Sequence, residues 1–160
     1  MTVIQINKNL DFIKDLVGHK FPINIVQLCS TLGIDLVFSD KLHNDGYIYC
    51  NGGTRIIFIN SKILNTHRKK FIIAHEIGHY MLHNDTHLQG CNNIYDTFER
   101  YHIYEEKEYE ANYFASELLL PKGKVIENLS NNPITFDLIS RIAFDYDVSM
   151  KLTSIKSVEN

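Results

Sequence analysis

A run of apolar residues from Phe71 to Leu82 contains the pattern His75-Glu76-x-x-His79. On an α-helix, residues four positions apart lie on one face, about a turn from each other. The two imidazoles can therefore bind one zinc ion, and Glu76 can act on a water molecule at that ion without ligating it. Because buried imidazoles and carboxylates need polar partners, the apolar surroundings favour a metal site over two structural histidines.

The composition predicts one compact domain, with room for a small helical appendage. The chain has 160 residues, 44% of them hydrophobic, and a formal net charge of −3. Residues 131–160 carry four acidic against three basic side chains. A surface that binds phosphates should be clearly positive, so direct nucleic-acid binding is not expected.

The cysteines and the N-terminal sequence indicate in which cellular compartment the protein is expected. Cys29, Cys50 and Cys91 are far apart and form no CxxC pair, so a cysteine-based zinc site is not expected. The N-terminus does not have the pattern of a signal peptide, and no apolar stretch approaches membrane-spanning length. These features predict a cytoplasmic protein with reduced cysteines and no membrane partner.

The order of apolar patterns predicts an α+β fold. A small sheet of about three strands, antiparallel at a glycine-containing hairpin, should pack on the helix that carries the histidine motif. The expected strands are 34–38, 47–50 and 55–59. The expected helices are 8–18, 22–32, 65–83, 104–120, 134–145 and 149–158, the last two forming a C-terminal pair. Residues 84–103 should be a functional loop, a lip over the site, or contain a short helix. Lys69 and Lys70 are expected to be solvated.

A catalytic zinc usually takes three protein ligands and leaves one position for water. His83 lies two turns after His75, so it cannot share an ion with both motif histidines. Asp85 stands where a longer metzincin motif has its third histidine, and Leu82 replaces the glycine of that motif, which excludes the class. The remaining candidates are Asp85, His87, His102 and the glutamates of the helix at 104–120.

Among these glutamates, Glu108 is the best candidate for the third ligand. At about 100° per residue, it shares one stripe with apolar and aromatic side chains, namely Tyr104, Ala111, Ala115 and Leu119. Glu105, one turn earlier, is the second choice, whereas Glu106 and Glu110 are expected on the solvated far side. Asn112 follows Glu108 by one turn and can support a metal ligand through a hydrogen bond.

Two segments resemble the signatures of the ImmA/IrrE family of zinc metallopeptidases. Residues 71–82 are similar to its HEIGH-type motif, and residues 108–121 resemble E-x-x-A-N-x-F-A-x-x-L-L-x-P, with Leu120 where the family often has Met. The resemblance covers about residues 20–125 and leaves 126–160 as a helical C-terminal extension of the single domain. It implies a gluzincin-like fold in which His75, His79 and Glu108 bind Zn²⁺ and Glu76 is catalytic.

The resemblance further implies limited proteolysis of a helix-turn-helix repressor, usually encoded beside the peptidase on a phage or integrative element. In this mechanism Glu76 takes a proton from water and delivers it to the leaving nitrogen. The oxyanion needs a further donor besides the metal, for which Tyr101, His102 and Tyr104 are candidates. Strand 55–59 is a candidate for binding substrate as an added strand. The alternative function is a zinc-stabilised module that sequesters a repressor without cutting it.

Overall fold

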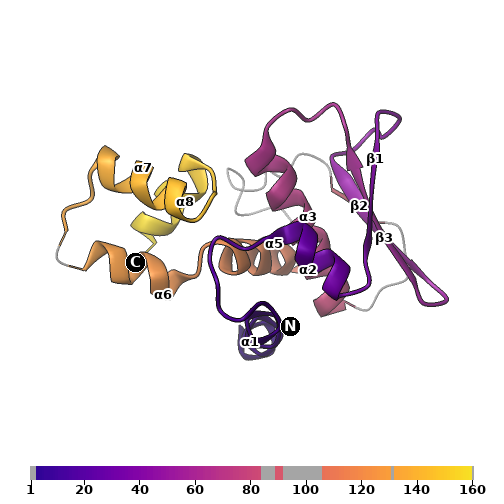
Figure 1. Ribbon diagram of the computed structural model, residues 1–160, viewed down its shortest axis with the longest axis horizontal. Helices are drawn as coiled ribbons and strands as arrows, with labels where there is room; N and C mark the ends of the chain where they lie inside the picture. The colour runs from indigo at the N-terminus through magenta and orange to yellow at the C-terminus, as the bar shows by residue number, and fades with distance from the viewer. Residues whose placement is uncertain (1–2, 84–88, 92–105, 131, 160) are drawn as a thin grey trace.

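The computed structural model describes residues 3–83, 89–91, 106–130 and 132–159 (Figure 1). One small sheet and a set of helices make up this part of the chain, which confirms the expected α+β class. In chain order the elements are α1 (Val3–Val17), α2 (Ile25–Thr31), β1 (Asp35–Ser39), β2 (Gly46–Asn51), β3 (Thr54–Asn60), α3 (Thr66–His83), β4 (Gln89–Cys91), α5 (Glu106–Leu119), α6 (Lys122–Leu129), α7 (Phe136–Asp145) and α8 (Met150–Val158).

The described strands form one sheet in the order β1-β3-β2-β4. The expected hairpin is present, since β2 and β3 pair antiparallel around Gly52 and Gly53, whose φ angles of 55° and 89° suit a tight turn. Two details differ from the expectation. β1 pairs parallel to β3, and the short strand β4, inside a segment expected to be a loop or a short helix, pairs with β2.

The position of β3 rules out the expected role of its strand in substrate binding. β3 hydrogen-bonds to β1 on one side and to β2 on the other. A peptide that adds to a sheet needs a free row of backbone groups, which only an outer strand offers. Residues 55–59 therefore cannot accept a substrate strand. The order of strands in space depends on long-range pairing, which the sequence pattern of a single strand does not contain.

The helix that carries the histidine motif is the centre of the fold. α3 covers the expected residues, and the side chain of Asn65 caps it by accepting a hydrogen bond from the Arg68 N–H at 2.8 Å. It packs against β2 and β3 as well as α2 and α5 (Figure 1), so its residues from Lys70 to His79 are buried. This burial explains the near-continuous apolar run around the motif.

The C-terminal pair of helices is also present. Thr135 caps α7 by accepting from the Leu138 N–H at 3.2 Å, and Ser149 caps α8 by accepting from the Leu152 N–H at 3.1 Å. A further short helix, α6, follows Pro121 and was not expected. No helix in the described parts of the chain is both long and apolar enough to cross a membrane.

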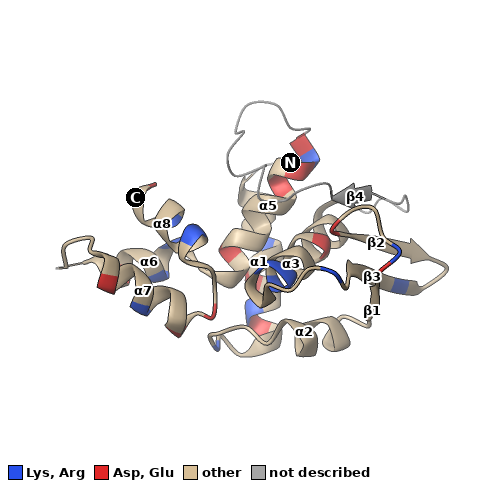
Figure 2. Ribbon diagram, turned by 90° about the horizontal axis from the view of Figure 1, so that it is seen from above, with Lys and Arg blue, Asp and Glu red and all other residues tan. Residues whose placement is uncertain are grey.

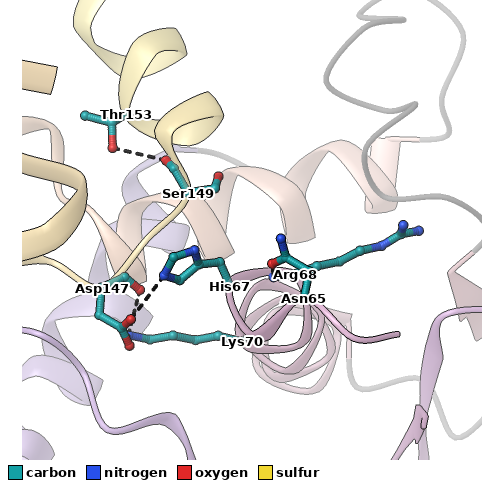
Figure 3. Close-up of polar contacts among 7 residues, drawn as sticks. All are labelled: Asn65, His67, Arg68, Lys70, Asp147, Ser149 and Thr153. Carbon is teal, nitrogen blue, oxygen red and sulfur yellow. Dashed lines mark hydrogen bonds and ion pairs between the residues drawn. The ribbon is translucent and has the colours of Figure 1, made fainter. Parts of the chain in front are cut away.

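The turn between α7 and α8 is tied to the beginning of α3 (Figure 3). The Lys70 ammonium donates to the Asp147 carboxylate at 2.9 Å and to the Asp147 carbonyl oxygen at 3.1 Å, while His67 Nε2 lies 3.2 Å from the same carboxylate. Lys70 is only 9% exposed, so the expectation that it is solvated was wrong. Its partner lies 77 residues away in the chain, beyond the reach of a local pattern.

A second ion pair ties α8 to α5. The ammonium of Lys156, which is buried, contacts the carboxylate of Glu117. The same carboxylate accepts a hydrogen bond from the Lys122 N–H at 3.1 Å, at the start of α6. The C-terminal helices are thus held to both α3 and α5, the two helices that carry the metal-site candidates.

We expect Asp147→Asn to lower the free energy of unfolding by about 1 kcal/mol at neutral pH, because charged hydrogen bonds to Lys70 and His67 are lost at a half-exposed site. Asn tolerates the positive φ of Asp147, 50°, as well as Asp does. Asp145→Asn, which changes an exposed carboxylate nearby, is the control. Urea unfolding of the three proteins measures the difference in free energy of unfolding. Equal stability of Asp147→Asn and the parent would contradict the claim that the contacts of Asp147 with Lys70 and His67 stabilise the fold.

The same difference should depend on pH. Burial alone would raise the pKa of Asp147, but the hydrogen bonds and charges of Lys70 and His67 outweigh it and lower the pKa below the ordinary value. The ionised carboxylate therefore stabilises the fold above the pKa of an unfolded Asp, about 3.9. This contribution is lost as the pH falls through the lower pKa of the folded state. The free energies of unfolding of the parent and of Asp147→Asn should therefore converge in acid.

Candidate metal centre

Gly78 allows α5 to pack directly against the middle of α3. A Cβ atom at Gly78 would lie 3.1 Å from Phe114 Cδ1 and 3.2 Å from both the Cα and the carbonyl oxygen of Ala111. Ala111 and Phe114 are fully buried at this contact. The absent side chain thus brings the two helix backbones close together, and with them the polar side chains near the start of α5.

The close contact brings together the three residues that were predicted to bind a metal. His75 Nε2 and His79 Nε2 are 2.9 Å apart. The Glu108 carboxylate places Oε2 at 3.3 Å from His75 Nε2 and Oε1 at 3.2 Å from His79 Nε2. Four ligands at the 2.0–2.1 Å typical of zinc lie about 3.3 Å from one another in a tetrahedron. The donor atoms, two imidazole nitrogens and a carboxylate, fit such an ion in type and in spacing.

The charge state of Glu108 also suits a ligand. Burial alone would raise the pKa of its carboxyl group, but the hydrogen bonds and charges of His75 and His79 outweigh this effect and hold the pKa well below its usual range. Glu108 is therefore ionised at neutral pH, as a carboxylate ligand must be.

The outer nitrogen of each motif imidazole also has a partner. His75 Nδ1 lies 2.9 Å from Asn112 Oδ1, so Asn112 lies where the sequence prediction put a supporting residue. His79 Nδ1 lies 3.0 Å from His83 Nδ1. With both Nδ1 atoms directed at side-chain partners, both Nε2 atoms face Glu108. Metal-binding histidines commonly have such outer partners, which orient the ring and select its tautomer.

Glu110 was expected on the solvated side of α5, and this was wrong. It is 5% exposed, and its Oε2 lies 3.0 Å from His83 Nε2. Burial lowers the pKa of His83, which Glu110 partly offsets through a hydrogen bond. The partner stands at the far end of α3, so the periodicity of α5 could not reveal it. The only sequence signal was a histidine one turn after His79 on the same helix face.

Glu76 is fully buried on α3 between the two histidines, and it is not among the residues whose ligand atoms converge. Among the described residues, the His75, His79 and Glu108 group is the one cluster with the donors and spacing for a metal. The other predicted site residues lie outside the described parts of the chain, namely Asp85, His87, Tyr101, His102, Tyr104 and Glu105.

We expect Gly78→Val to cost about 1–3 kcal/mol of stability and to weaken metal binding, because the added methyl groups push α5 and Glu108 away from the histidines. Gly123→Val is the matched control, since a Cβ at Gly123 has no neighbour within 4 Å. It should change the free energy of unfolding by less than about 0.5 kcal/mol. Thermal unfolding and zinc titration of both variants measure the effect. Equal metal affinity in both would show that this close approach is not needed for the site.

Comparison with known proteins identifies a family whose model matches most of the chain. Residues 29–156 match the model of the M78 peptidase family, described as IrrE N-terminal-like domain. The chain is similar to Metallopeptidase ImmA of Bacillus subtilis, with 29% identity over 111 residues, which cover 66% of this chain and 59% of that protein. It is also similar to Uncharacterized immunity region protein 2 of Bacillus phage phi105, with 31% identity over 119 residues, 73% of this chain and 70% of that protein. The family match reaches into α8, beyond the residue 125 at which the resemblance was expected to end.

Proposed function

Because this chain belongs to the ImmA/IrrE family of metallopeptidases, we propose that it is a zinc-dependent endopeptidase that cleaves a partner repressor. The observation that carries the proposal is the convergence of His75, His79 and Glu108, whose ligand atoms lie within 4.8 Å of one another. Glu76, which follows His75 on α3, is fully buried. Three protein ligands are the number typical of catalytic zinc sites, which keep one position for water or substrate.

Zinc held by His75, His79 and Glu108 would supply a Lewis acid that lowers the pKa of water towards ~7 and polarises the scissile carbonyl. In our proposal Glu76 accepts a proton as water adds to the carbonyl carbon, and it delivers that proton to the leaving nitrogen as the peptide bond breaks. The products are a carboxylate and an amine. The burial of Glu76 in the middle of α3 supports this role, since a fully buried side chain on a helix has little freedom to leave its position.

Asn112 serves the same reaction by orienting the ring of His75. Tyr101, His102 and Tyr104 remain our candidates for the donor that stabilises the oxyanion. With β3 enclosed in the sheet, a substrate that adds as a strand would use an outer strand, and the outer strands of the described sheet are β1 and β4.

The partner that we propose is a repressor of the helix-turn-helix type. The resemblance to the ImmA/IrrE family supports it, as does the similarity to a phage protein that is named for an immunity region. We do not propose that the chain itself reads DNA. The ribbon in Figure 2 carries both basic and acidic positions along α6 and α7, and residues 131–160 hold four acidic against three basic side chains. A surface that binds phosphates should instead be clearly positive.

The test mixes the purified protein with a candidate partner repressor of the helix-turn-helix type, with and without a metal chelator. We expect defined repressor fragments that disappear with the chelator and return when zinc is added back. A stable complex without fragments would instead favour the alternative function, a module that sequesters the repressor. A salt-sensitive shift of duplex DNA by this chain alone would contradict the expectation that it does not bind nucleic acid.

A further inference from the structure

A buried row of polar groups leads away from His79 on the side opposite Glu108. His79 Nδ1 lies 3.0 Å from His83 Nδ1, and His83 Nε2 lies 3.0 Å from Glu110 Oε2. The side chains of His83 and Glu110 are only 4% and 6% exposed. The two imidazoles come from consecutive turns of α3 and the carboxylate comes from α5, so the row joins the two helices that supply the metal-ligand candidates.

The order of these atoms determines where the protons lie. An ionised carboxylate only accepts hydrogen bonds, so His83 Nε2 must carry a hydrogen and donate it to Glu110. In a neutral imidazole the other nitrogen then has a lone pair, and His83 Nδ1 accepts. His79 Nδ1 must in turn carry a hydrogen and donate it. The lone pair of His79 is thereby left on Nε2, the atom that faces His75 and Glu108.

We propose that His83 and Glu110 form a positioning pair that holds His79 in the Nδ1–H tautomer, so that its Nε2 is available to a divalent metal ion. The proposal rests on the metal centre described above and extends it by two residues. Asn112 does the corresponding work for His75 with a single amide oxygen at 2.9 Å. Because α5 carries Glu108 and Glu110, one helix provides a ligand and also selects the tautomer of another ligand.

A purely structural tie between α3 and α5 would involve the same contacts, so the test must separate the two roles. His83→Leu removes the acceptor that faces His79 at similar side-chain size. His83→Asn removes the imidazole and its contact with Glu110, but its Oδ1 stands two bonds from Cβ, as His Nδ1 does, and can accept from His79. If His83 selects the tautomer of His79, His83→Asn should retain metal binding and His83→Leu should not. A structural tie predicts that both variants behave alike, since both lose the contact with Glu110.

The first measurement is the zinc dissociation constant of the folded full chain, by competition with a chromogenic chelator. We expect His83→Leu to bind zinc about 10–100-fold more weakly than the parent, the range typical for loss of an outer partner of a metal ligand. His83→Asn should recover most of this affinity. Unchanged affinity in His83→Leu, or equal losses in both variants, would overturn the proposal. If His83→Leu does not fold, His83→Phe replaces it, because Phe keeps a ring but offers no acceptor.

The second measurement needs no metal and separates this proposal from the proposed function. Nitrogen-15 NMR of the metal-free protein reports which ring nitrogen of His79 is protonated, with His79→Gln used to assign its signals. We expect the Nδ1–H form in the parent and in His83→Asn, and a shift towards the Nε2–H form in His83→Leu. An Nε2–H tautomer in the parent would reject the positioning pair even if zinc binds. An Nδ1–H tautomer in a chain that binds no zinc would reject the metal centre alone.

Discussion

Glu76→Gln is expected to keep the fold and the bound zinc but to cleave the partner about 10²–10⁴-fold more slowly than the parent. Gln is nearly isosteric with Glu, so the packing of this fully buried side chain is preserved. The amide cannot accept a proton from water, so the transfer step loses its general base. The loss corresponds to roughly 3–5 kcal/mol of activation free energy.

The measurement compares cleavage of the partner repressor by the parent and by Glu76→Gln at equal zinc content. Glu127→Gln makes the same chemical change on the exposed surface of α6 and should cleave at the parent rate. The Glu76→Gln variant should still bind the repressor and can trap it. Equal cleavage rates in Glu76→Gln and the parent would end the peptidase mechanism in this form. A loss of zinc in the variant would mean that Glu76 contributes to metal binding.

Glu108→Ala is expected to lower zinc affinity by more than about 100-fold, since even outer partners of metal ligands contribute 10–100-fold. The parent should bind one equivalent of zinc, and His75→Ala or His79→Ala should lose it in the same way. Two remaining ligands cannot complete a site of this type, and the buried imidazoles would lose the carboxylate that faces them. Elemental analysis of each purified variant measures the bound metal.

Glu106→Ala is the matched control for the third ligand, because Glu106 lies at the exposed start of the same helix. It should keep the full equivalent of zinc. Full occupancy in Glu108→Ala, together with loss in Glu105→Ala, would move the third ligand one turn towards the N-terminus. Zinc should also raise the unfolding temperature of the parent but not that of Glu108→Ala, because a ligand that binds the folded state stabilises it by mass action.

Local rules were enough to predict the parts of this protein that depend on neighbours in the chain. The spacing of His75 and His79 and the apolar run from Phe71 to Leu82 placed the motif helix. Two glycines placed the hairpin. The stripe on α5 predicted that Glu108 faces the core, and its carboxylate does lie beside the two histidines. Each of these rests on a helical or strand period, which a sequence displays directly.

Contacts between distant segments determined the features that the sequence analysis missed or predicted wrongly. Glu110 and Lys70 looked like solvated charges on their own helices, yet both are buried, because His83 lies 27 residues before Glu110 and Asp147 lies 77 residues after Lys70. The parallel pairing of β1 with β3, which places β3 inside the sheet, also depends on contacts between segments that are distant in the chain. A buried charge is stable only beside a partner, and folding alone determines which partner comes within reach. Local periodicity was therefore enough to identify the candidate ligands and the helices that carry them, whereas long-range packing established which charged side chains lie beside those ligands.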